Sequence, residues 1–473
     1  MKSYQPGSDI AVIGAGAAGS LTATRLLQHA DRHRLRLDVW LIDPARENGR
    51  GPAYGTEDAR HLLNVPAGRM TAFAEDPAHL VHWLADRHPQ HADHDAFVPR
   101  ALYGRYLSHV LDDTARRTAG ARLHRVHARA IGTAHHDDST LSFLLSSGRT
   151  LRVDAAVLAL GNFAADCRWA PEALRTSHRF VAAPWSPDAL SAVPPGADVL
   201  LVGTGLTMAD LTLSLRRPDR TLIAVSRSGL LPQPHAAEPL PQFPPPVTTG
   251  PPGLDAFRRA VLTHLSRSRR AHGDWRPGFD SLRPLTSDLW RQLPPADRTR
   301  FLKEHLRLWE VHRHRMPPPT AAAVRQACEL GQLRLASARL TDATVTGDGV
   351  RVRLSTGTTL DVGAVVNCTG SRSDVGSLDD PFLHSLFKTG LARPHATGLG
   401  LSATRDGRLL SARGRGDTMA PLWALGSLLR GELLETTAIP EIRVQADEIA
   451  ASAVALLTRG EHPQRHQGLF ASP

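Results

Sequence analysis

The chain has 473 residues, of which 41% are hydrophobic and 22% are charged. This length predicts two or three domains, and the composition excludes a disordered, collagen-like or coiled-coil protein. No apolar run reaches the roughly 18 residues of a membrane span. The three cysteines lie far apart, which excludes a disulfide framework and favours a reducing, cytoplasmic location.

The formal net charge is +10, which favours anionic cofactors and an anionic substrate. Nucleic acid is not expected as a partner, because the arginines are scattered and no run of five or six basic residues occurs. No metal-ligand spacing is present, so no metal is predicted. A signal peptide is not expected either, because Asp9 interrupts the first apolar stretch and three glycines follow within it.

The first predicted unit is β-α-β. A strand over residues 9–13 enters the turn Gly14-x-Gly16-x-x-Gly19, and a helix is expected over residues 20–29. In such a turn the first glycine permits the tight bend, the second lets the backbone approach a pyrophosphate, and the third lets helix and strand pack closely.

The start of that helix, with Ala17 and Ala18, offers free N–H groups and a positive dipole to phosphate. A second strand over residues 37–42 ends at Asp43, whose carboxylate is expected to accept hydrogen bonds from ribose hydroxyls. The unit therefore predicts a dinucleotide site.

Little strand character follows between residues 50 and 105, so loops and short helices are expected there. A small antiparallel meander is predicted over residues 122–153. A further buried strand over residues 155–160 ends at Gly161. Such strand ends turn sharply beside a bound nucleotide or at a domain crossing.

A second β-α-β unit is predicted from a strand over residues 198–202 that enters Gly203-x-Gly205. A helix is predicted over residues 208–215, with Leu206 and Thr207 before it as further cofactor contacts, and the next strand ends at Arg227. An arginine at this place can pair bidentately with a 2′-phosphate, so the unit favours NADPH over NADH.

Residues 232–253 are Pro-rich and are expected to form a long loop, which is uncommon in a compact chain and often functional. Helices are predicted over residues 254–330. Strands ending at Gly370 and Gly426 follow. A last helix over residues 440–457 has Thr437 as its expected cap and is expected to point its positive end at a flavin.

Several stretches resemble a bacterial family of FAD/NAD(P)-binding proteins related to HpyO-type urate hydroxylases and nitrosuccinate-forming aspartate N-hydroxylases. The resemblance covers nearly the whole chain. It is carried by Gly49 to Thr56, His61 to Ala67, Phe97 to Gly104, Gly203 to Asp210, Asp274 to Arg276, Arg313 to Arg315 and Glu435 to Gln445.

The resemblance implies an α/β fold with two Rossmann-like domains. An FAD domain over residues 1–190 and 373–473 would be interrupted by an NAD(P)H domain over 191–372, with a helical insert at about 254–330. Related flavoproteins often have Gly-Asp where this chain has Gly426-Ser427, so a side-chain contact to the ribityl chain is not carried over.

The resemblance also implies the site. Asn64 is expected beside the flavin ring, and Asn64, Arg313 and Arg315 are the candidate catalytic residues. A cluster of arginines there would suit a carboxylate or a urate-like anion. The residues expected to line the flavin and substrate space are Arg50, Asn64, Arg69, Trp275, Arg276, Arg313, His314 and Arg315. Further cofactor contacts are expected at Val65 and Ala128.

The predicted function is FAD-dependent, NADPH-consuming hydroxylation of a small polar metabolite, on nitrogen or on a ring carbon, through a C4a-(hydro)peroxyflavin formed with O₂. The alternatives are a flavin reductase that passes electrons to a quinone or a partner protein without oxygen insertion, and a flavin-binding protein without turnover. The substrate and the oligomeric state stay open, including a homo-oligomer.

Overall fold

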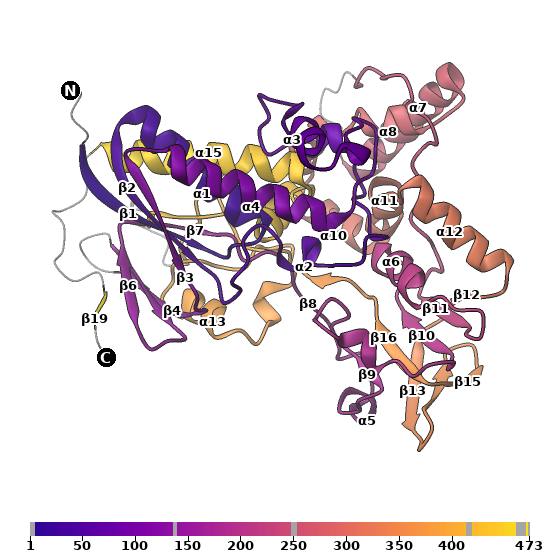
Figure 1. Ribbon diagram of the computed structural model, residues 1–473. Helices are drawn as coiled ribbons and strands as arrows, with labels where there is room; N and C mark the ends of the chain where they lie inside the picture. The colour runs from indigo at the N-terminus through magenta and orange to yellow at the C-terminus, as the bar shows by residue number, and fades with distance from the viewer. Residues whose placement is uncertain (1–4, 136–139, 247–252, 413–418, 460–469, 472–473) are drawn as a thin grey trace.

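The computed structural model describes residues 5–135, 140–246, 253–412, 419–459 and 470–471. These residues form two lobes, each built on a five-stranded parallel sheet, with a group of helices above the junction between the lobes (Figure 1). No helix in the described part of the chain combines the length and apolar character needed to cross a bilayer.

The sheet of the first lobe has the order β18-β7-β1-β2-β3, and all its neighbouring strands are parallel. Strands β7 and β18 and the last four residues of β1 are apolar and buried, as expected where a sheet is covered on both faces, whereas β2 and β3 also carry charged residues. Their bounds are Gln5–Ile13 for β1, Leu35–Ile42 for β2, Ala121–Val126 for β3, Ala155–Leu158 for β7 and Leu422–Ala424 for β18.

Alternate side chains of β1 enter two different cores. Ile10 and Val12 pack with the long helices, whereas Ala11 and Ile13 pack with an antiparallel meander on the opposite face. The helices are α1 (Ala17–His33), α4 (Arg100–Arg117) and α15 (Ile439–Thr458), with the short α2 (Gly51–Tyr54) and α3 (His79–Arg87) beside them. The other face carries β4 (Ala130–His135), β5 (Leu141–Leu145), β6 (Thr150–Val153), β19 (Phe470–Ala471) and α13 (Pro381–Lys388).

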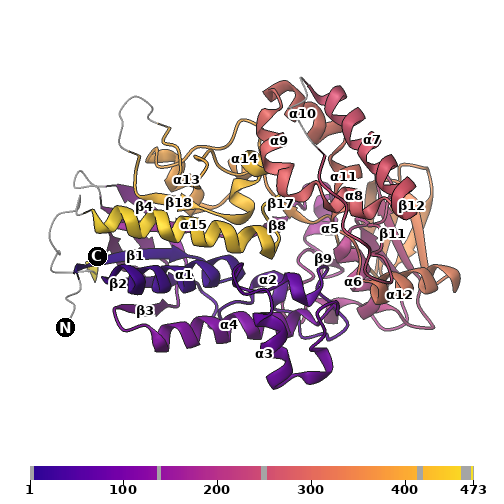
Figure 2. The ribbon, with the colours of Figure 1, turned by 90° about the horizontal axis from the view of Figure 1, so that it is seen from above.

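Two sequence predictions in this lobe were wrong in detail. The segment that begins at residue 122 is not part of the meander, because β3 pairs in parallel with β2. Helix α1 is longer than residues 20–29: it starts at the glycine turn and ends where Arg34 adopts a left-handed conformation. In Figure 2, α15 lies alongside α1 over the sheet.

The sheet of the second lobe has the order β12-β11-β10-β16-β9 and is also parallel. Helices α6 (Leu206–Leu215) and α12 (Pro318–Glu329) cover one face, and an antiparallel three-stranded sheet covers the other. The strands are β9 (Phe180–Val181), β10 (Val199–Val202), β11 (Leu222–Ser226), β12 (Leu333–Ser337), β13 (Leu340–Val345), β14 (Val350–Leu354), β15 (Thr359–Val362) and β16 (Ala364–Asn367).

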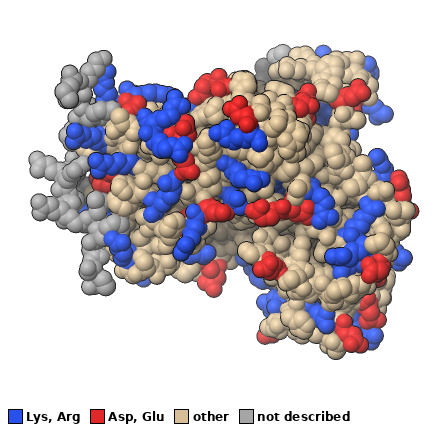
Figure 3. Space-filling model, viewed as in Figure 1, with Lys and Arg blue, Asp and Glu red and all other residues tan. Residues whose placement is uncertain are grey.

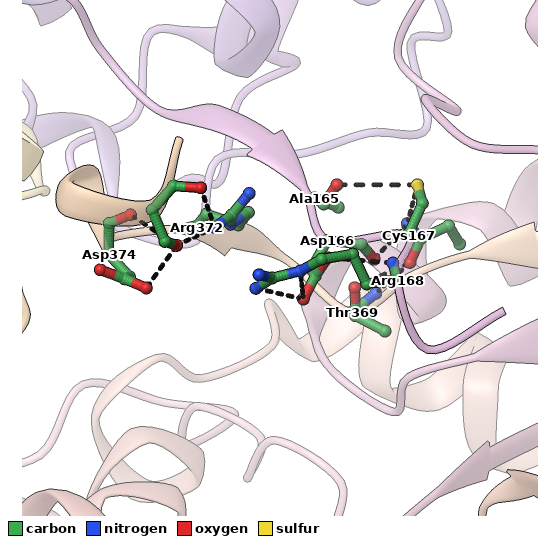
Figure 4. Close-up of polar contacts among 9 residues, drawn as sticks. Ala165, Asp166, Cys167, Arg168, Thr369, Arg372 and Asp374 are labelled. Atoms are coloured by element: carbon green, nitrogen blue, oxygen red, sulfur yellow. Dashed lines mark hydrogen bonds and ion pairs between the residues drawn. The ribbon is translucent and has the colours of Figure 1, made fainter. Parts of the chain in front are cut away.

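The chain crosses between the lobes twice, and the crossings pair with each other as the antiparallel strands β8 (Phe163–Ala165) and β17 (Ser371–Arg372). Figure 4 shows this ribbon and the nearby contacts, including the ion pair of Arg168 with Asp166. Because β9 follows β8 and belongs to the second sheet, we propose that the domain boundary lies before β9 rather than at residue 190.

The helical insert runs through α7 to α11. Its helices are α7 (Leu254–His272), α8 (Arg276–Asp280), α9 (Thr286–Gln292), α10 (Pro295–Glu304) and α11 (Leu306–Arg313). It packs on α14 (Arg430–Leu433) and on the segment before α15, through Trp290 and Leu434. The short α5 (Glu172–Arg175) lies beside β13.

An ion pair also joins the two lobes. Arg100 Nη2 of α4 lies 2.7 Å from Asp210 Oδ2 of α6; the Asp210 side chain is buried and that of Arg100 is largely buried. His61 Nε2 lies 2.9 Å from Ser214 Oγ, whose hydroxyl donates to Asp58 at 2.7 Å. Three of the stretches that carry the family resemblance therefore meet at this contact.

Candidate functional site

The first glycine turn has no room for side chains at two positions. Gly14 has φ +104°, and a Cβ there would lie 2.3 Å from the Ala159 carbonyl oxygen. A Cβ on Gly19 would lie 1.8 Å from the Gly14 carbonyl oxygen. The sequence assigned these glycines to a tight turn and to close packing of helix on strand, and the geometry confirms both requirements.

The middle of the same turn is open. A Cβ on Gly16 would meet only the Gly51 Cα, at 3.9 Å, and no side chain caps the start of α1. The N–H groups around Ala17 and Ala18 are thus free of a side-chain cap at the positive end of a 17-residue helix. This arrangement fits a dinucleotide pyrophosphate.

Asp43 holds the turn. Its Oδ2 accepts a hydrogen bond from the Ala15 N–H at 2.7 Å, and its Oδ1 accepts one from the Ala45 N–H at 2.8 Å. A carboxylate can accept about four hydrogen bonds, so two acceptor positions are left for ribose hydroxyls.

The other expected cofactor residues of this lobe follow the same edge of the sheet. Ala128 comes after β3, Gly161 after β7 and Gly426 after β18. A Cβ on Gly161 or Gly426 would meet nothing within 4 Å. The Ser427 hydroxyl, for which no ribityl contact was expected, donates instead to the Gly161 carbonyl.

The second turn repeats this plan. Gly203 has φ +117°, and a Cβ there would lie 2.2 Å from the Cys368 carbonyl oxygen. Nothing lies within 4 Å of a Cβ placed on Gly205 or Gly370. Helix α6 begins at Leu206, with Thr207 next, and no side chain caps it. The place of the third glycine is taken by Met208, which is fully buried.

Two arginines stand beside the second turn. Arg227 follows β11 and is exposed, and none of the described carboxylates forms an ion pair with it. Arg307 of α11 donates from Nη2 to the Leu230 carbonyl at 2.6 Å and to the Thr204 carbonyl at 3.2 Å. Burial lowers the pKa of Arg307, and the Arg227 cation lowers it further, so the two charges are neighbours.

A cavity lies where the two lobes and the helical insert meet. It encloses about 480 Å³, including space that opens to solvent. It brings together five of the eight residues expected to line the flavin and substrate space. The lining residues are Asn64, Val65, Pro66, Arg69, His235, Asp280, Arg283, Arg313, His314, Arg315 and Ala438.

The three arginines of the helical insert in this cavity are already paired. Arg313 Nε donates to Glu435 Oε2 at 2.7 Å. Arg283 holds Glu441 through two hydrogen bonds, at 2.5 and 2.8 Å.

The third pair joins Arg315 to Asp280. The prediction that clustered arginines would face an anion therefore needs revision for Arg313 and Arg315, since a carboxylate from the chain neutralises each.

Arg69 differs from these three. Its side chain is exposed, it lines the cavity, and no carboxylate among the described residues lies within ion-pair distance of it. On the face shown in Figure 3, acidic side chains interrupt the basic ones. Arg69 is therefore a cation of the cavity lining without a carboxylate partner among the described residues.

The buried histidines of the cavity are neutral. Burial lowers the pKa of His314. Burial and, second, the Arg315 cation lower the pKa of His235 to about 4. Burial opposes ionisation of Glu435, but the Arg313 cation and a hydrogen bond from Trp309 Nε1, at 2.7 Å, hold its pKa below the usual range. The carboxylate is therefore charged and the imidazoles are not.

Three of the eight residues expected to line the flavin and substrate space lie outside this cavity, namely Arg50, Trp275 and Arg276. Arg50 pairs with Glu57 at 2.6 Å. Arg276 pairs with Asp274 at 2.6 Å and lies over the Trp275 ring. Thr437 does not cap α15, whose N-cap is Ala438 without a side-chain hydrogen bond, and it lines a smaller neighbouring cavity that shares His314.

Sequence reasoning missed His235, Asp280, Arg283 and Arg307. His235 lies in the Pro-rich loop that the sequence marked as unusual, so position in that loop was an available signal. The others lie on short helical segments of the insert, where the sequence does not tell a charged residue that faces a site from one that faces solvent.

A comparison with protein families agrees with the first turn and its sheet. Residues 11–163 match the model of the FAD-NAD(P)-binding family. This segment is an FAD/NAD(P)-binding domain. No curated protein matches the chain.

Solved structures match over almost the full length. The ornithine hydroxylase of Pseudomonas aeruginosa in its reduced form is 16% identical, with TM-score 0.64, covering 95% of this chain and 99% of that one. L-lysine 6-monooxygenase from Pseudomonas syringae is 18% identical, with TM-score 0.63 and coverages of 95% and 99%. An ornithine N-hydroxylase from Kutzneria with reduced FAD, NADP⁺ and L-ornithine is 14% identical, with TM-score 0.61 and coverages of 96% and 100%. The chain has the fold of these enzymes.

Proposed function

We propose that the protein is an FAD- and NADPH-dependent monooxygenase that hydroxylates a small anionic metabolite carrying nitrogen. The observation that carries this proposal is the cavity at the junction. Its walls come from the FAD lobe at Asn64 to Arg69, from the second lobe at His235, and from the start of α15 at Ala438. A substrate there would be reached by both dinucleotides, as ligands of open α/β sheets bind beyond the carboxyl ends of the strands.

The residues that would hold FAD are those of the first turn and its sheet edge: Gly14, Gly16, Ala17, Ala18, Gly19, Asp43, Ala128, Gly161 and Gly426. Those that would hold NADPH are Gly203, Gly205, Leu206, Thr207, Gly370 and Arg227. When bound, the pair supplies hydride transfer from nicotinamide to flavin and the activation of O₂. The chain supplies binding, orientation and exclusion of water.

Arg69 is the proposed anion contact, because its charge is unbalanced whereas Arg313 and Arg315 are paired. Asn64 is proposed beside the flavin ring. Arg313 and Arg315 are proposed as positioning residues that fix the insert on α15 and on the cavity wall. The uncapped start of α15 turns a positive helix end toward the cavity through Ala438.

Nitrogen as the target atom is supported by the fold shared with the ornithine hydroxylase and the lysine monooxygenase. The test is a panel of L-ornithine, L-lysine, cadaverine, L-aspartate and urate. For each compound, NADPH consumption, O₂ uptake, peroxide and hydroxylated product are measured. We expect one member to accelerate NADPH consumption and to give a product heavier by one oxygen atom.

Peroxide alone with every member would count against hydroxylation. Reduction of a quinone by NADPH without O₂ uptake would support the reductase alternative. A matched control for the anion contact is Arg105→Ala: Arg105 is an exposed arginine of α4 that does not line the cavity. Arg69→Ala is expected to raise the KM of the substrate at least tenfold, and Arg105→Ala to leave it unchanged.

A further inference from the structure

The Pro-rich loop after β11 is fixed where it enters the cavity. The His235 N–H donates to the Met316 carbonyl at 2.9 Å, and the Met316 N–H donates to the Gln233 carbonyl at 2.9 Å. Arg276 Nε donates to the Pro234 carbonyl at 3.0 Å. An isolated parallel β-bridge thus pairs Pro234 with Met316, and this contact fixes the backbone that carries the His235 side chain.

The ring of His235 reaches across to the other lobe. Its Nε2 lies 3.0 Å from the Asn64 carbonyl oxygen, and the ring packs against Phe97 with centroids 5.0 Å apart. A carbonyl oxygen only accepts hydrogen bonds, so Nε2 carries the hydrogen. Since the imidazole is neutral, Nδ1 has no hydrogen and presents a lone pair.

Nothing in the described protein occupies that lone pair. No hydrogen bond reaches Nδ1 from the described residues, and Nδ1 is not among the polar side-chain atoms buried without a partner. His235 lines the cavity, and its Nδ1 is not sealed from solvent, so we infer that a ligand in the cavity can reach it. The cavity wall therefore presents one hydrogen-bond acceptor of fixed tautomer, and the exposed cation of Arg69 lies in the same lining.

We propose that His235 is a substrate-binding residue whose Nδ1 accepts a hydrogen bond from an N–H group of the bound substrate. The inference rests on the proposed function, because it takes the cavity to be the substrate site. It narrows the substrate class to a small anion that presents an N–H donor to Nδ1 while its acidic group meets Arg69. A ligand without an N–H donor would leave Nδ1 without a partner, which disfavours it.

The first test uses binding to the FAD-loaded protein, with urate and L-aspartate as probes because each is an anion with N–H groups. Binding is followed by changes in the visible flavin spectrum. His235→Phe keeps a ring against Phe97 and removes both nitrogens. The matched control is His312→Phe: His312 lies in α11, bonds the Leu308 carbonyl at 2.8 Å and does not line the cavity.

We expect the affinity of at least one probe to fall about tenfold or more in His235→Phe and to stay unchanged in His312→Phe. Without probe, the absorption bands of the flavin should keep their wild-type positions. The rate of flavin reduction by NADPH should stay within about twofold of the wild-type rate. Equal affinity of both probes for His235→Phe and for the wild-type protein would overturn the proposal.

A second measurement needs no variant. Diethyl pyrocarbonate acylates imidazole nitrogens that carry a free lone pair. In the wild-type protein we expect His235 to be modified, as mapped by peptide mass spectrometry, and a saturating probe to slow this modification severalfold. Lack of modification, or modification unaffected by either probe, would overturn the proposal. These readouts involve no oxygen chemistry, so a failure of hydroxylation would leave them intact and the two failures can be told apart.

Discussion

The two glycine turns share one backbone plan but are held in place by different means. In the first turn, the strand-end Asp43 accepts a hydrogen bond from the Ala15 N–H, so the contact comes from the β-α-β unit itself. In the second turn, Arg307 of the helical insert donates to the Thr204 carbonyl. The second turn also has a contact within its own unit, between Thr204 Oγ1 and Ser226 Oγ at 2.8 Å, and it adds the contact from Arg307, about a hundred residues away.

We expect the largest effect from adding a side chain at a glycine of the first turn that has no room for one. Gly19→Ala puts a Cβ 1.8 Å from a backbone oxygen, so the helix must move away from the strand. We expect a loss of roughly 2–3 kcal/mol in unfolding free energy and purification without flavin. The matched change is Gly205→Ala, where a Cβ meets nothing within 4 Å.

Gly205→Ala should keep the wild-type Tm and FAD content and weaken only NADPH. Thermal unfolding and the ratio of flavin to protein absorbance measure both variants. If Gly19→Ala retained FAD as well as Gly205→Ala does, the close packing of the first turn would not matter for cofactor binding.

The second prediction concerns Arg227, which follows β11 in the second lobe as Asp43 follows β2 in the first. Arg227→Ala should raise the KM of NADPH by about ten- to a hundredfold, because a charge-assisted pair with the 2′-phosphate is lost, and should leave NADH unaffected. Arg334→Ala is the control, an exposed arginine on β12. An equal change for both nucleotides would contradict recognition of the 2′-phosphate at Arg227.

The third prediction concerns the hydrogen bonds that Asp43 accepts from the backbone of the first turn and the residues after it. Asp43→Asn replaces one acceptor oxygen by an amide that faces a backbone N–H, so one hydrogen bond of the turn is lost. We expect FAD affinity to fall about tenfold, measured by fluorescence titration of the apoprotein. Asp38→Asn is the control, because Asp38 lies on β2, the strand that leads to Asp43, and contacts His124 instead.

The fourth prediction concerns the hydrogen bonds that Arg307 of the helical insert donates to the second turn and to the loop after β11. Arg307→Met removes the hydrogen bonds to Thr204 and Leu230 and should weaken NADPH and NADH alike, by roughly three- to tenfold. This shared loss separates Arg307 from Arg227. Arg300→Met, in the neighbouring helix, should have no effect on either nucleotide.

The smallest effect is a pH dependence in the first lobe. Hydrogen bonds from Arg25, in α1, lower the pKa of Glu75 to about 2 from 4.5. The pair therefore stabilises the protein fully above about pH 4.5 and loses its contribution as the pH falls toward 2. Glu75 is more than half exposed, so we expect less than about 1 kcal/mol.

Glu75→Gln should reduce the stability difference between pH 5 and pH 3, as measured by urea unfolding at both values. If the difference in unfolding free energy stays unchanged, the Arg25–Glu75 ion pair does not stabilise the packing of α1.

Much of this arrangement was predictable from the sequence because it depends on local pattern. The glycine turns, their flanking strands and the α/β class follow from apolar runs that end at glycine, and the structure confirms them. The strand over residues 121–126 was misassigned to the meander because a short strand gives no sign of which neighbour it pairs with. Helix α1 was underestimated because its alanines carry little amphipathic pattern.

The site was harder to predict because its charges depend on tertiary pairing. Arg313 and Arg315 were expected to face a substrate, yet Glu435 and Asp280 neutralise them from other segments. Arg69 is distinguished from the other arginines only in the folded chain, where no carboxylate of the described residues lies within ion-pair distance of it. His235 was hidden in a loop whose path depends on Met316, some eighty residues later.

The most direct test of the central claim, that the two turns seat FAD and NADPH close enough to react, is anaerobic mixing of the FAD-loaded protein with NADPH. We expect the visible absorbance of oxidised flavin to bleach within seconds with NADPH and more slowly with NADH. A protein that takes up no flavin, or whose bound flavin keeps its colour under saturating NADPH, would contradict it.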